Sequence, residues 1–102
     1  MMWRHGDVMI AAVGSVPETA TRRPAPILAR GEATGHSHRI SDPRTAEVFD
    51  DPANKAQGFL RVTADTALLV HDEHASIPLP RGTYRFWQQR EYSPEAIRTI
   101  MD

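Results

Sequence analysis

The chain has 102 residues, the size of one domain, and its 40% hydrophobic and 25% charged residues are ordinary for a globular protein. Its formal net charge of −1 gives no general attraction to nucleic acid or to an anionic membrane surface. The absence of cysteine excludes disulfides and thiolate ligands, so any transition metal must be held by nitrogen and oxygen.

The sequence also indicates where the protein resides. No hydrophobic run approaches the roughly 20 residues of a membrane-spanning helix. The first residues do not have the pattern of a secretory signal. We therefore expect a cytoplasmic protein that makes no use of a membrane, built as a single β domain over residues 1–102.

Short hydrophobic segments separated by turn residues predict an all-β fold. We expect strands at residues 8–13, 27–32, 34–40, 46–49, 59–63, 66–71 and 83–91. Residues 14–26 hold three prolines and predict a loop, and a second proline-marked turn is expected at 77–82. Ala64-Asp65 is expected to join two strands as a hairpin. About seven or eight short strands favour a small barrel or sandwich.

One helix is expected at the C-terminal end. Ser93 is a suitable N-cap, Pro94 fits the first helical position, and Glu95 is favourable at the positive end of the helix dipole. The helix would cover residues 93–101.

Four histidines lie in two tight sequence clusters. Alternate residues of a strand share a face, so His36 and His38 point the same way as Ile40, which indicates an inward face. His71 and His74 follow about thirty residues later, at the end of another expected strand. Neutral imidazole is the commonest metal ligand among side chains that titrate near neutral pH. We predict that His36, His38, His71 and His74 bind a metal.

Two other interpretations of these histidines stay open. Single histidines are more often hydrogen-bonded structural residues than ligands, and a pair at i and i+2 could form a pH-sensitive surface patch. His5 lies near the N-terminus and is left out of the predicted ligand set.

Carboxylates near the histidines are candidates for catalysis. Glu73 is flanked by histidines and Glu32 precedes the His-x-His pair, and either one beside a metal would serve as a ligand or as a general base on bound water. Otherwise each is an ordinary solvated carboxylate. Asp42 and Asp72 are further candidate ligands.

The expected cofactor is a divalent transition metal. Zinc with three protein ligands and an open position acidifies a bound water, and two histidines with one carboxylate suit Fe(II) or Mn(II). We expect zinc first, with Mn, Fe, Ni or Cu as alternatives. The function would be hydrolytic or oxidoreductive, with a small-molecule ligand at the open position.

The histidine pair lies in a pattern that resembles the first motif of the cupin superfamily. Gly31, His36, His38 and Asp42 match that motif, with a spacer one residue short and with aspartate in place of the usual glutamate. The resemblance implies a small β-barrel with a metal inside, often as a dimer, and it does not name a reaction.

The second cupin motif is matched in part. Residues 80–82 fit its Pro-x-Gly start, but Arg85 and Gln89 stand where histidine and asparagine belong. His71 or His74 would have to replace the missing histidine. Three segments, at 31–38, 71–74 and 89–92, also resemble a small bacterial family without an assigned activity, and the start at Gly6-Asp7-Val8 is similar to β-clip domains.

Two functions of other classes stay open. A non-enzymatic interaction module would use the loops at 14–26 and 50–57 for contacts with a larger complex. A nucleic-acid-binding barrel would use the arginines at positions 22, 23, 30, 39, 61, 81, 85 and 90, but alternating aromatic and basic residues occur only at 84–87, which does not favour it. Exposed strand edges in so small a barrel favour a homodimer.

Overall fold

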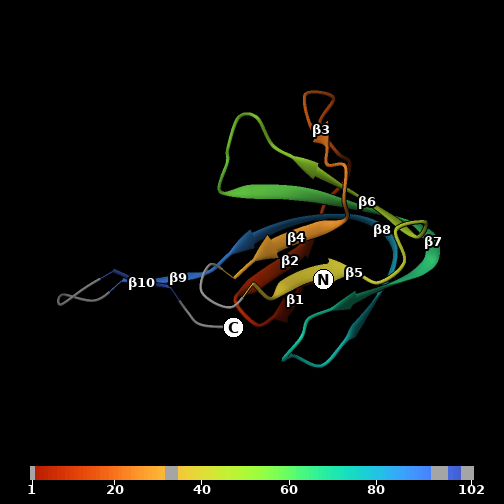
Figure 1. Ribbon diagram of the computed structural model, residues 1–102. Helices are drawn as coiled ribbons and strands as arrows, with labels where there is room; N and C mark the ends of the chain where they lie inside the picture. Colours follow the sequence, from red (N-terminus) through yellow and green to blue (C-terminus); the bar gives the residue numbers. More distant parts are fainter. Residues whose placement is uncertain (1, 32–34, 93–96, 100–102) are drawn as a thin grey trace.

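The computed structural model describes residues 2–31, 35–92 and 97–99. Its main feature is an eight-stranded antiparallel sheet in the order β1-β2-β8-β7-β5-β4, with β6 beside β7 and β3 beside β6 (Figure 1). The strands are β1 (Met2–His5), β2 (Val8–Ala12), β3 (Thr21–Arg22), β4 (Ile27–Arg30), β5 (Ser37–Ile40), β6 (Ala46–Asp50), β7 (Gln57–Val70) and β8 (Ile77–Gln88). The all-β prediction is confirmed.

Two long strands, β7 and β8, connect the two halves of the sheet, one in which β6 lies beside β7 and one in which β5 lies beside β7. They pair along their length except at a bulge between Val62 and Thr66. Before the bulge β7 also pairs with β6, and after it with β5. A bulge bends a strand, and Figure 1 shows β7 curving around one side of the molecule. The predicted hairpin at Ala64-Asp65 is therefore wrong, because these residues lie in the bulge of one continuous strand.

The predicted turn at 77–82 is also wrong, because β8 runs through it. Pro78 and Pro80 lie opposite Leu68 and Thr66 of β7, in a part of β8 that does not pair with β2. Proline has no N–H to donate, so it is tolerated in a strand where one side has no neighbouring strand.

The core contains side chains from both halves of the sheet. It consists of Val8, Ile10, Leu28, Ile40, Ala46, Val48, Leu60, Val62, Ala67, Leu69, Leu79, Tyr84 and Phe86. On β5 both His38 and Ile40 are buried, so the prediction of an inward face is confirmed for these two residues.

Two finer predictions about the fold are wrong. The sheet is not a closed cupin-like barrel, because β1 and β4 lie at its two ends and do not pair with each other. The expected C-terminal helix is replaced, over the residues described, by β10 (Ile97–Thr99), which pairs with β9 (Arg90–Tyr92). Two of the three residues of β10 are β-branched, which favours a strand. The other residues of that helix, 93–96 and 100–101, lie outside the described part of the chain. None of the described residues belongs to a helix that could cross a bilayer.

Candidate metal centre

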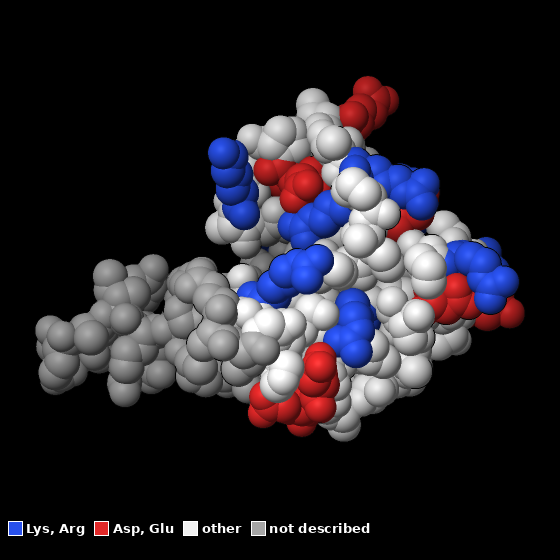
Figure 2. Space-filling view, viewed as in Figure 1, with Lys and Arg blue, Asp and Glu red and all other residues white. Residues whose placement is uncertain are grey.

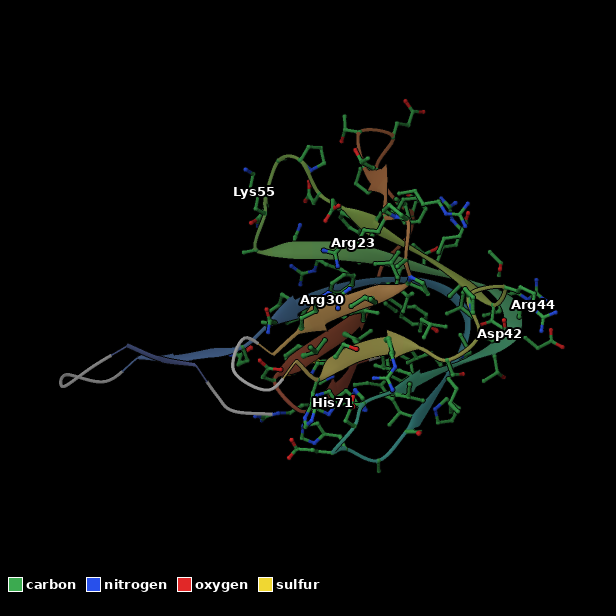
Figure 3. All side chains as sticks on the ribbon, viewed as in Figure 1. Arg23, Arg30, Asp42, Arg44, Lys55 and His71 are labelled. Atoms are coloured by element: carbon green, nitrogen blue, oxygen red, sulfur yellow. The ribbon has the colours of Figure 1, made fainter. Side chains whose placement is uncertain are left out.

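All five histidines gather at one end of the sheet, where the β1–β2 turn lies near the β7–β8 loop (Figure 1). His5 ends β1, His36 precedes β5, His38 lies within β5, His71 follows β7, and His74 lies in the β7–β8 loop. Figure 3 labels His71 at this end of the molecule. The structure therefore brings the two sequence clusters together and adds His5 to them.

The imidazole rings contact one another in pairs. Ring centroids are 4.3 Å apart for His38 and His71, 4.6 Å for His71 and His74, 4.9 Å for His5 and His38, and 5.7 Å for His36 and His71. In the described ranges, no three or more histidines, aspartates or glutamates have their donor atoms set around one point as a metal ion requires. Binding of an ion would therefore need rotation of side chains.

Burial keeps the rings of His5 and His38 neutral. His5, His38 and His71 are at most 7% exposed. Burial lowers the pKa of His38 to about 4, and the neighbouring rings of His71 and His5 act in the same direction, against the attraction of Asp7. Burial also lowers the pKa of His5. At pH 7 both rings are therefore in the neutral form that binds metals.

The turn between β1 and β2 shapes the floor of the site. Gly6 has a φ of 61°, a left-handed conformation that glycine adopts most readily. A Cβ at Gly6 would lie 2.6 Å from His74 Nε2 and 3.0 Å from His38 Cε1. Glycine thus allows both the tight turn and the close packing of two imidazoles on it.

Asp7 in the same turn is a buried acid that contacts the histidines. It is 1% exposed. Its Oδ2 accepts a hydrogen bond from Gln88 Nε2 at 3.0 Å, and its Oδ1 lies 3.2 Å from His38 Nε2. Sequence reasoning missed both His5 and Asp7, because they lie more than twenty residues before the other histidines. The turn residues Gly6-Asp7 could have indicated them, since this turn folds β1 back onto β2.

Glu73 lies at the rim of the cluster. Its Oε1 is 2.6 Å from His36 Nδ1, and both side chains are partly exposed. Its backbone N–H donates to His71 Nδ1 at 3.0 Å. Glu73 therefore lies where a candidate base is expected, whereas Glu32 falls outside the described residues.

The other two carboxylates are paired with arginines. Asp72 pairs with Arg39 at 2.8 Å. Asp42 pairs with Arg44 at 3.1 Å, and Figure 3 shows these two residues together, well away from His71. The acid of the cupin-like motif therefore does not reach the histidines, and Asp42 as a candidate ligand is wrong.

The fold and the site define a small all-β domain with a buried histidine cluster at one end of its sheet. A family model described as a domain of unknown function (DUF8820) matches residues 4–89, and the chain belongs to this family. The matched segment contains all five histidines and Asp7. No curated protein and no solved structure matches the chain. The family description names no activity, so function must be argued from the site.

Proposed function

We propose that this domain binds a divalent transition metal at the histidine cluster. The observation that carries the proposal is convergence: segments far apart in the sequence bring five imidazoles together, with neighbouring ring centroids 4.3–6.2 Å apart. Polar rings in a protein interior destabilise it unless they find partners. A metal ion bound by several imidazoles compensates for their burial.

The metal would be bound by nitrogen, with zinc the first expectation and Mn, Fe, Ni or Cu as alternatives. The candidate ligands are His36, His38, His71 and His74 from the sequence pattern, joined by His5 from the fold. The partly exposed Glu73 is suited to act as a base on a metal-bound water. A hydrolytic or oxidoreductive activity on a small molecule is the matching proposal. It rests on the histidines and not on the cupin resemblance, because the sheet is open.

The test is metal content. Protein made without a histidine tag, stripped with a chelator and then offered Zn, Mn, Fe(II), Ni and Cu(II) separately should retain about one equivalent of one ion. His38→Ala should lose it, and Arg44→Ala, far from the cluster, should keep it. Less than about 0.1 equivalent of every ion would contradict the proposal.

The arginines do not favour a nucleic-acid-binding function. Several are already paired with acids: Arg22 and Arg61 with Glu47, Arg23 with Asp50, Arg39 with Asp72, and Arg81 with Asp65. Binding to phosphates would have to displace these partners. Titration of a labelled oligonucleotide at low and high salt checks this, with no salt-dependent binding expected.

An interaction module is the second candidate function, and a groove along β4 favours it. The groove has a volume of about 440 Å³ and is lined by residues 23–25 and 27–30. β4 is the last strand at its end of the sheet, so an extended segment can pair beside it once it displaces Arg23, which donates to the carbonyls of Ile27 and Leu28. Figure 2 shows basic side chains across this face, and Figure 3 places Arg30 and Lys55 there, together with Arg23, which already pairs with Asp50. An acidic extended segment of a partner is the expected occupant.

Substitution separates the two candidates. The double variant Arg30→Glu and Lys55→Glu should weaken binding of an acidic partner and leave metal content unchanged. Retained partner binding would contradict the docking proposal. A homodimer formed through β1 or β4 is the related proposal, and light scattering of the purified chain measures it directly.

A further inference from the structure

His5 and His38 face each other through the same ring atom. Their Nδ1 atoms are 2.9 Å apart. On the far side of each ring lies an oxygen: His5 Nε2 donates to the carbonyl of Ala75 at 2.9 Å, and His38 Nε2 is 3.2 Å from the carboxylate of Asp7. Gln88 holds that carboxylate through its other oxygen.

The contacts in this row need one more hydrogen than two neutral imidazoles carry. The carbonyl of Ala75 only accepts, and the Asp7 carboxylate 3.2 Å from His38 Nε2 favours a hydrogen on that nitrogen, so with the Nδ1–Nδ1 contact the row favours three hydrogens, whereas two neutral imidazoles carry one each. When His5 and His38 give their hydrogens to Ala75 and Asp7, the two Nδ1 lone pairs point at each other. That arrangement is repulsive unless a cation lies between them.

We propose that a divalent metal ion binds His5 and His38 through their Nδ1 atoms and takes His74 Nε2 as its third ligand. This coordination mode rests on the proposed metal-binding function and specifies its ligands. Metal-binding histidines usually donate their other N–H to a carboxylate or a backbone carbonyl. Asp7 and Ala75 already provide those two acceptors, so Asp7 is a positioning residue and not a ligand.

Such an ion requires a small separation of His5 and His38 together with rotation of the imidazole rings. Ligand nitrogens about 2.05 Å from a tetrahedral zinc are about 3.3 Å apart. To reach that geometry, the His5–His38 nitrogen pair at 2.9 Å has to open by about 0.4 Å and the two rings have to rotate so that their lone pairs converge on the ion. His74 Nε2 is buried and makes no hydrogen bond within the described residues. Its ring and that of His38 both pack on Gly6, and we expect rotation of His74 to bring this nitrogen to the ion.

The remaining two histidines are assigned to the rim. His71 Nδ1 accepts the N–H of Glu73, which puts the hydrogen of the neutral ring on Nε2 and makes that nitrogen a donor. His36 Nδ1 contacts the Glu73 carboxylate. Three protein ligands then leave one position open, as in catalytic zinc sites.

Nitrogen-15 NMR of the full chain labelled at histidine tests this inference, with zinc chloride as the probe. On addition of zinc, the Nδ1 resonances of His5 and His38 and the Nε2 resonance of His74 should shift to metal-bound values. The Nε2–H signals of His5 and His38 should persist. His71→Gln should bind zinc within about threefold of the native chain, and Asp7→Asn should bind it about 10–100-fold more weakly.

Two outcomes overturn the inference in different ways. Zinc binding through the Nε2 atoms of His36 and His71, with His5 unshifted, would refute this ligand set and leave the proposed function standing. No zinc binding at all would refute both. If Asp7→Asn does not fold, Gln88→Ala removes only the brace of the Asp7 carboxylate, and it should weaken zinc binding severalfold. Unchanged affinity in that variant would contradict the positioning role.

Discussion

The histidine end of the sheet and the bend at the β7 bulge handle polar side chains in opposite ways. At the bend, Asp42 pairs with Arg44 and Asp65 with Arg81, and all four side chains are at least 40% exposed. At the histidine end, the side chains of His38 and Asp7 are 0% and 2% exposed. Exposed pairs add little stability, whereas buried polar groups destabilise a fold unless fully partnered. The comparison shows that the histidine end buries polar groups of the kind that the bend leaves in solvent.

The largest effect is expected from His38→Ala. This variant removes a proposed ligand and also the partner of His5 and Asp7, so affinity for zinc should fall more than about 100-fold. Isothermal titration with zinc measures it, and circular dichroism checks that the variant remains folded. Affinity within a few-fold of the native chain would place the metal site elsewhere.

Two glycines provide a matched pair for the turn beneath the cluster. Gly6 and Gly35 both have positive φ, at 61° and 75°, but among the residues that the structure describes only a Cβ at Gly6 would meet other atoms. Gly35→Ala should lower the free energy of unfolding by roughly 1–2 kcal/mol through backbone strain. Gly6→Ala adds the clash with His74 and His38, so we expect a loss larger by about 1–3 kcal/mol. Urea denaturation measures both, and equal losses would show that the rings do not pack on the turn.

The stability of the metal-free protein should depend on pH because of the buried histidines. The folded-state pKa of His38 is lowered from 6.5 to about 4, and that of His5 is lowered too. Between those values the unfolded chain binds more protons than the folded one, so the free energy of unfolding falls as pH drops from about 6.5 toward about 4. Urea denaturation in a chelator at several pH values follows this slope. His38→Gln should flatten it, and an equal slope in that variant would contradict the assignment.

The smallest effect is expected at the bend. Arg44→Ala breaks an exposed pair with Asp42, so the melting temperature should stay within about 2 °C of the native value. Zinc affinity should not change. A large loss in either measurement would mean that the bend and the histidine end are energetically coupled.

The sequence predicted short individual strands better than it predicted which segments join into one long strand. The strands expected at 27–32 and 46–49 follow from hydrophobic pattern and turn residues, and the structure has them at Ile27–Arg30 and Ala46–Asp50. The long strands β7 and β8 were not predicted as continuous strands, because the bulge in β7 and the prolines in β8 have the sequence pattern of turns. The helix signal at Ser93-Pro94 is local too, yet Ile97–Thr99 pairs with the segment before it.

The histidine cluster was also predicted only in part, because some of its residues are close in sequence and others are brought there by the fold. His36, His38, His71 and His74 are visible as two spaced pairs, and the strand ends that carry them do meet. His5 and the nearby Asp7 join the histidine cluster only because β1 pairs with β2 and β2 pairs with β8. These pairings belong to the tertiary structure. No spacing rule on the sequence reports such long-range pairing.

An anomalous difference map from crystals soaked in zinc tests the central claim most directly. One peak is expected inside the cluster, about 2.0–2.1 Å from imidazole nitrogens, with His5 and His38 among the ligands. An empty cluster, or peaks only at exposed carboxylates such as Asp65, would contradict the metal-binding account.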